Sequence, residues 1–243
     1  MSVNRRLIMA NWKMHGDFQS NKALLEGISQ RLTQCPEENV DIALCVPFPY
    51  LHQVQELLQG TNISWGSQDV SAYDKGAYTG QVSAHMLKEF GCSWSLVGHS
   101  ERRQYQGETN EEVAHKALRA IECGITPVVC IGETEKDYKD NLTLKTIKSQ
   151  LDPILNLGED LVNKMVFAYE PVWAIGTGLS ATPEQAQIVH EHIREWVGQN
   201  RIIYGGSVKP SNAANLFKMK DIDGVLVGGA SLFVEDFLGI VRA

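Results

Sequence analysis

Eight short apolar segments, spread along the whole chain and separated by helical patterns, constrain the fold more than any other feature of this sequence. Their apolar residues are mostly continuous rather than alternating, which is typical of strands that are covered on both faces. We therefore expect strands at Leu7–Asn11, Ile42–Val46, Ile63–Gly66, Ser95–Gly98, Thr126–Ile131, Val166–Tyr169, Ile202–Tyr204 and Gly224–Val227.

Helical patterns occupy the segments between these strands. Apolar residues recur at helical spacing on one face of residues Gln19–Leu32 and again of Glu111–Cys123. Thr182 opens a further helix, with a capping-box pattern and a proline at the first helical position. The last helical turns are expected at Ser211–Phe217 and Ser231–Leu238.

Strands that alternate with helices predict a parallel sheet with right-handed crossovers. Eight such units within 243 residues match the size of a (β/α)8 barrel, so we expect an α/β fold with one barrel domain over residues 1–243. An open doubly wound sheet is the alternative. It would favour a Gly-x-Gly-x-x-Gly turn after the first strand, and residues Asn11–Gly16 do not form one.

Composition narrows the classes of function. A net charge of −7 argues against a general role at nucleic acids or membrane surfaces. No segment approaches the roughly 20 apolar residues of a membrane span, and the apolar run near the N-terminus is too short for a signal peptide. The five cysteines form no Cys-x-x-Cys pair, which is typical of reduced thiols in a cytoplasmic protein.

Unusual polar residues gather at the ends of the expected strands. The carboxyl ends of barrel strands carry the active sites of such folds. Five of the eight expected strands end in candidate site residues: Asn11 and Lys13 after the first, His99 and Glu101 after the fourth, Glu170 after the sixth, Ser207 after the seventh, and Gly228 and Gly229 after the eighth. This agreement predicts a functional site at the mouth of the barrel.

Glu170 is the candidate general base. A carboxylate is costly to bury unless it has a partner or a function, and this one follows an apolar strand and precedes a long loop. The loop from Pro171 to Ala181 has a rigid start and a small-residue tip, as expected for a lid. From this segment alone, a structural Glu that caps the strand is an equal alternative.

The glycine turns at Ser207 and at Gly228-Gly229 are candidate phosphate sites, because backbone N–H groups there can bind an anion. For either turn alone, a tight turn without a ligand is the simpler interpretation. Lys13 can hold an anion or pair with a carboxylate, for which Glu101 is a plausible partner. The His, Asp and Glu spacings match no metal-ligand set.

Taken together, these motifs resemble those of the triosephosphate isomerase family over essentially the full length of the chain. The matching segments are Asn11-Trp12-Lys13-Met14, residues 98–103 (GHSERR), residues 169–178 (YEPVWAIGTG), residues 204–208 (YGGSV) and residues 227–231 (VGGAS).

The resemblance implies a TIM barrel that interconverts dihydroxyacetone phosphate and D-glyceraldehyde 3-phosphate in glycolysis and gluconeogenesis, without a metal or an organic cofactor. By motif, it implies that Glu170 is the base and His99 the electrophile, with Glu101 as a supporting carboxylate. The implied substrate contacts are Asn11, Lys13, Gly176, Ser207, Gly228 and Gly229.

The resemblance also implies a homodimer, in which the long loop of residues 67–82 docks beside the active site of a second subunit with Thr79 at its tip. The sequence departs from the usual family pattern at four positions, which are His15, Asp69, Gln81 and Leu179. None of these is an implied proton-transfer residue.

Two other functions fit the fold. A different phosphate-handling barrel enzyme is one, but an aldolase would need a Schiff-base lysine inside a strand, and Lys13 lies beyond its strand. A non-catalytic phosphate-binding protein is the other, since fold alone does not specify function. Binding alone does not require a base, so the combination of Lys13, His99 and Glu170 disfavours it.

Overall fold

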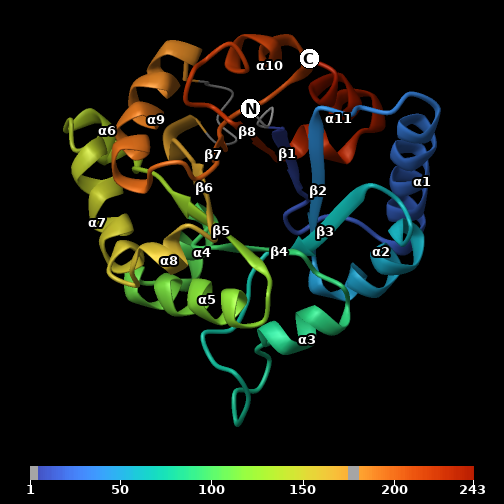
Figure 1. Cartoon of the computed structure of the whole chain (residues 1–243), viewed down its shortest axis with the longest axis horizontal. Helices are drawn as coiled ribbons and strands as arrows, with labels where there is room; N and C mark the ends of the chain where they lie inside the picture. Colours follow the sequence, from blue (N-terminus) through green and yellow to red (C-terminus); the bar gives the residue numbers. More distant parts are fainter. Residues whose placement is uncertain (1–4, 175–180) are drawn as a thin grey trace.

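The eight strands form a closed barrel in which every strand is parallel to its two neighbours and β1 pairs with β8 (Figure 1). This computed structural model describes residues 5–174 and 181–243. The strands are β1 Arg6–Asn11, β2 Val40–Val46, β3 Ile63–Ser67, β4 Trp94–Val97, β5 Thr126–Ile131, β6 Val166–Tyr169, β7 Ile202–Tyr204 and β8 Gly224–Val227. The predicted (β/α)8 barrel is confirmed, and the open sheet is excluded.

Helices surround the barrel as an outer ring (Figure 1). The α-helices are α1 Phe18–Gln34, α2 Leu51–Leu58, α3 Ala84–Glu89, α4 Ser100–Gln106, α5 Asn110–Glu122, α6 Glu135–Lys139, α7 Thr143–Leu155, α8 Glu159–Val162, α9 Pro183–Val197, α10 Pro210–Leu216 and α11 Val234–Val241. Within the described residues, three short 3-10 helices follow β2, β6 and β8: η1 Phe48–Tyr50, η2 Val172–Ala174 and η3 Gly229–Leu232.

Most predicted boundaries lie within two residues of the observed ones, and Thr182 caps α9 through the predicted capping box. The helix predicted at Ser231–Leu238 is wrong in one respect. Phe233 is extended and separates η3 from α11, which begins at Val234. Two acidic residues in the first turn of α11 favour a helix start there, because they complement the helix dipole.

The core has two layers that both depend on the strands. One apolar cluster lies between the outward side chains of the strands and the helices, with Ile8, Leu44 and Phe167 among its members. The second contains Leu7, Met9 and residues of β2 and of β4 to β8, so the barrel is filled rather than hollow. No helix in the described part of the chain is long and apolar enough to cross a membrane.

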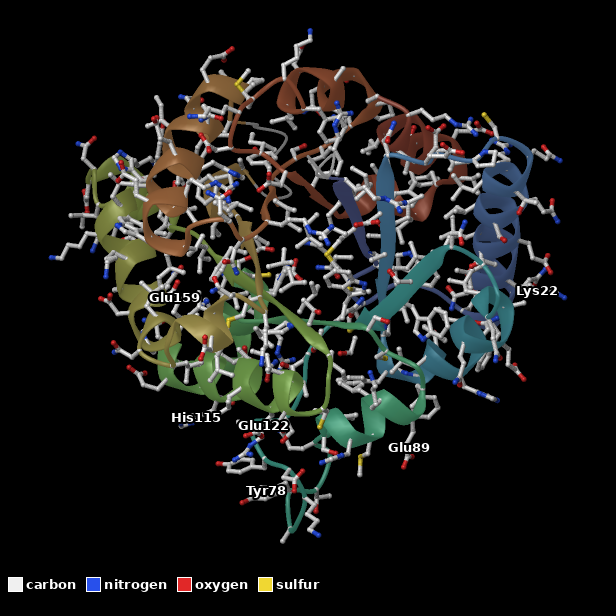
Figure 2. The ribbon with its side chains drawn as sticks, in the orientation of Figure 1. Lys22, Tyr78, Glu89, His115, Glu122 and Glu159 are labelled. Carbon is white, nitrogen blue, oxygen red and sulfur yellow. The ribbon has the colours of Figure 1, made fainter. Side chains whose placement is uncertain are left out.

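The long segment between β3 and α3 projects away from the barrel (Figure 1). Residues 73–81 are all exposed, and Tyr78 lies near the outer end of this projection (Figure 2). Its ring stacks on that of Tyr73 at a centroid distance of 3.8 Å. Two large aromatic rings that remain exposed on a projecting loop are an unusual feature of an isolated surface.

A cluster of buried charges anchors the base of this projection. Lys116 on α5 is 2% exposed, and its Nζ lies 2.9 Å from Asp69 Oδ1 and 2.5 Å from Glu108 Oε1. Arg102 on α4 pairs with the same two carboxylates. Burial raises the pKa of Asp69, although both cations oppose this shift. The two cations therefore balance two carboxylates that would otherwise be buried with their charge uncompensated.

We predict that Lys116→Met lowers the free energy of unfolding by about 3–5 kcal/mol, because it leaves Asp69 and Glu108 buried with one cation between them. Urea unfolding at neutral pH measures this loss. Lys148→Met is the matched control, since Lys148 pairs with Asp152 on the exposed face of α7 and its loss should cost less than about 1 kcal/mol. Equal losses in the two variants would contradict the role assigned to the cluster.

Candidate functional site

A cavity of about 280 Å³ opens where the carboxyl ends of β1, β4, β6, β7 and β8 converge. It brings together seven of the residues that the sequence singled out: Asn11, Lys13, His99, Glu170, Ser207, Gly228 and Gly229. Glu101 lies in the adjoining cavity, which Asn11, Lys13 and His99 also line. Gly176 and Leu179 lie outside the described residues.

Glu170 is 1% exposed and follows directly after β6. Its backbone N–H donates to the carbonyl oxygen of Ile131 at 2.7 Å, which continues the strand pairing by one residue. Its carboxylate accepts a hydrogen bond from the backbone N–H of Ser100 at 3.0 Å and lies 3.2 Å from Nε2 of His99. The carboxylate is therefore held by two donors of the β4–α4 segment.

The hydrogen bonds of His99 define which ring nitrogen carries its proton. His99 is the N-cap of α4, and its Nδ1 accepts a hydrogen bond from the backbone N–H of Glu101 at 3.2 Å. The proton of the neutral ring is therefore on Nε2, which points at Glu170. His99 is thus arranged as a hydrogen-bond donor toward the cavity.

Lys13 lies between Glu101 and the glycine turn after β8. Its backbone has φ +54°, and its N–H donates to the side-chain oxygen of Asn11 at 3.0 Å. Its Nζ donates to the carboxylate of Glu101. A methyl group added to Gly228 would lie 3.5 Å from Cε of Lys13, so the lysine stem passes next to the glycine turn after β8.

The two glycine turns also line the cavity. A side chain at Gly205 would lie 2.9 Å from Cγ of Glu170, so only glycine leaves room for the carboxylate there. A side chain at Gly229 would meet no atom within 4 Å, which means that this backbone faces open space. An anion in this part of the cavity would lie within reach of backbone N–H groups and the Lys13 ammonium.

Sequence reasoning missed Glu133, which follows β5 and is completely buried. Its Oε1 accepts hydrogen bonds from the Tyr169 hydroxyl at 3.1 Å and from Trp173 Nε1 at 2.8 Å. Burial raises the pKa of Glu133, and these hydrogen bonds partly oppose the shift. The position of Glu133 at the carboxyl end of β5 was the feature of the sequence that could have identified it. Through these hydrogen bonds Glu133 holds Tyr169, which precedes Glu170, and Trp173, which follows it.

Cys130 lies at the end of β5, close enough to Glu170 for the carboxylate to affect its titration. Burial, reinforced by the negative charge of Glu170, raises the pKa of the Cys130 thiol well above its usual value. A thiol that stays protonated is a poor nucleophile. Within the described residues, no group of three or more His, Cys, Asp or Glu side chains has a metal-binding arrangement.

Three of the four departures from the family pattern lie within the described residues, each in a different environment. His15 lines the 280 Å³ cavity, Asp69 belongs to the buried charge cluster, and Gln81 is exposed on the projecting loop. Of the three departures within the described residues, His15 alone lines the 280 Å³ cavity.

Comparison with known proteins agrees with this geometry. The family model for triosephosphate isomerase matches residues 6–243. A triosephosphate isomerase of Bordetella pertussis is 54% identical over 245 residues, covering 98% of this chain and 97% of its own length. Those of Cupriavidus taiwanensis and Coxiella burnetii are 53% and 50% identical, covering 99% and 97% of this chain and 100% and 96% of their own lengths. The chain therefore belongs to the triosephosphate isomerase family.

Proposed function

We propose that this chain interconverts dihydroxyacetone phosphate and D-glyceraldehyde 3-phosphate through an enediolate intermediate, a step of glycolysis and gluconeogenesis. The observation that carries the proposal is the pairing of a buried carboxylate with an imidazole donor. Oε1 of Glu170 lies 3.2 Å from Nε2 of His99. Triosephosphate isomerases are themselves the established example of a glutamate base beside a neutral histidine at a helix N-terminus.

In the proposed mechanism, Glu170 removes a proton from the carbon next to the substrate carbonyl. The electrons of that C–H bond form a C=C bond, and the carbonyl oxygen becomes an enediolate oxygen, which Nε2 of His99 and Nζ of Lys13 stabilise. A proton then moves between the two substrate oxygens, and Glu170 returns its proton to the neighbouring carbon. Because one substrate carbon is oxidised while its neighbour is reduced, the reaction needs no external electron acceptor.

No single residue accounts for a typical enzymatic rate. A positioned acid or base contributes about 10²–10⁴-fold, and one donor to a developing oxyanion about 2.7–4 kcal/mol. Since enzymes accelerate reactions by at least about 10⁶-fold, the proposal needs Glu170, His99 and Lys13 to act together. Each oxygen of Glu170 has one contact with a protein donor, and each keeps a further lone pair that can accept the substrate proton.

The substrate phosphate is proposed to bind at Ser207, Gly228 and Gly229, with Asn11 and Lys13 contacting the rest of the molecule. Gly176 is proposed as a further contact, on a lid over residues 171–181. A bound phosphate supplies remote binding energy that can drive closure of such a lid. The aldolase alternative is disfavoured, because none of the eight strands contains a lysine for a Schiff base.

A homodimer through residues 67–82 is the proposed assembly. The projecting loop carries exposed Tyr73 and Tyr78, and a cavity of about 370 Å³ beside the active site is bordered by exposed Met14 and Tyr105. A projection and a cavity on the same chain allow a self-complementary two-fold interface. Residue Thr79, at the tip of the loop by motif, would then dock beside the partner's active site.

We predict that Glu170→Asp lowers kcat by about 100-fold and changes KM much less, because the shorter side chain retracts the carboxylate from the substrate carbon. An isomerase assay that starts from dihydroxyacetone phosphate and couples the aldehyde product to NADH formation measures both constants. Glu170→Ala should abolish most turnover, together with deuterium exchange into the substrate from heavy water. Unchanged kcat in the aspartate variant would remove Glu170 as the base.

We predict that His99→Gln keeps the fold and loses about 10²–10³-fold in kcat, because it replaces the donor aimed at the developing oxyanion. Circular dichroism and thermal unfolding establish that the variant is folded, and the same assay gives its kcat. His115→Gln is the matched control, since His115 is exposed on the outer face of α5 (Figure 2). Near-normal turnover of the His99 variant would exclude His99 from the mechanism.

We predict that light scattering gives twice the mass of one chain, and that Thr79→Arg shifts the protein toward monomers with reduced kcat. The added charge at the loop tip would have to be buried in the partner cavity, which is costly. Ile188→Arg, on an exposed position of α9, should leave both mass and kcat unchanged. A fully active wild-type monomer would contradict the proposed dimer.

A further inference from the structure

A glutamine on α7 binds the backbone next to β5 as a neighbouring strand would. Gln150 is 9% exposed, and its amide makes two hydrogen bonds to one residue. Its Oε1 accepts from the backbone N–H of Gly132 at 2.8 Å, and its Nε2 donates to the carbonyl oxygen of Gly132 at 3.0 Å. An amide that binds both backbone groups of one residue fixes the position and the orientation of that residue.

Gly132 in turn lies against the backbone of Glu170. A Cβ at Gly132 would be 1.8 Å from the carbonyl oxygen of Glu170 and 2.6 Å from its carbonyl carbon. The two backbones are therefore packed as closely as glycine permits, and a shift of Gly132 is transmitted to Glu170 directly.

The residues on either side of Gly132 hold the same segment. Ile131 accepts a hydrogen bond from the N–H of Glu170 at 2.7 Å, and the carbonyl oxygen of Glu133 accepts one from Val172 at 3.2 Å. The backbone of residues 131–133 thus forms a segment that holds the backbone of residues 170–172 through two hydrogen bonds and one close packing contact. Gln150 fixes Gly132, the central residue of this segment, and does not itself line the 280 Å³ cavity.

We propose that Gln150 is a positioning residue for the isomerisation. It fixes the position and orientation of the Glu170 carboxylate through the backbone of residues 131–133. The inference rests on the proposed function. Misplacing a reacting group by about 1 Å can cost about 100-fold in rate. The proposed phosphate contacts, Ser207 and Gly228, lie after β7 and β8, so loss of Gln150 should affect kcat rather than KM.

The chain contains a matched control for this side chain. Gln187 on α9 also makes two hydrogen bonds to a single residue, accepting from the N–H of Asp221 at 3.0 Å and donating to its carboxylate at 2.6 Å. Asp221 precedes β8 and therefore lies at the opposite end of the barrel from the site. Gln187→Met and Gln150→Met remove the same number of hydrogen bonds with the same change of side chain.

The test compares these two variants of the full chain with the wild type by thermal unfolding and by the isomerase assay. Gln150→Met should lower kcat about tenfold or more with KM changed by less than about threefold, whereas Gln187→Met should keep kcat within about twofold. In a Glu170→Ala background, Gln150→Met should leave the residual turnover unchanged, because the group that it positions is already absent.

Three results would overturn the inference: wild-type kcat in Gln150→Met, an equal loss of kcat in Gln187→Met, or a further loss of turnover in the Glu170→Ala background. If Gln150→Met does not fold, Gln150→Glu decides, because it keeps the acceptor for Gly132 N–H and loses the donor. A lowered kcat supports the role, and a normal kcat excludes it. An inactive wild type overturns the proposed function as well, whereas an active wild type with unaffected variants overturns the positioning role alone.

Discussion

Closure of the sheet between β1 and β8 is the constraint on which the rest of the molecule depends. Every strand pairs in parallel with two neighbours, for example Leu7 of β1 with Gly224 of β8 and Tyr169 of β6 with Tyr204 of β7. This closed pairing leaves no free edge and turns all eight carboxyl ends toward one rim. Residues that are more than 200 positions apart in sequence then line one cavity. A site made of single residues after separate strands exists only because the barrel is closed.

Within that rim, the buried carboxylate of Glu170 sets the main electrostatic requirement. A carboxylate that is almost fully removed from water needs donors, and the β4–α4 segment supplies two of them, Ser100 N–H and His99 Nε2. The same backbone geometry at the start of α4 fixes the imidazole tautomer through Glu101 N–H. One helix N-terminus therefore holds the proposed base and orients the proposed electrophile together.

Behind the cavity, several polar groups hold the segment that carries Glu170. Glu133 binds Tyr169 and Trp173 on either side of it, and Gly132 packs against its carbonyl group while Gln150 holds Gly132. These contacts come from β5 and α7, which contribute little to the cavity wall itself. Part of the environment of the proposed base is thus built by residues that do not line the cavity.

The sequence by itself determined the barrel, most of its boundaries and seven of the residues that line the cavity, because continuous apolar strands, capping patterns and strand-end polar residues are local signals. It did not determine the split at Phe233, the buried cluster around Lys116, or the supporting roles of Glu133 and Gln150. Each of these depends on which side chains meet across elements distant in sequence, as Gln150 meets Gly132 and Lys116 meets Asp69. Such contacts follow from the closed register and from the space left for each side chain, which only the tertiary structure specifies.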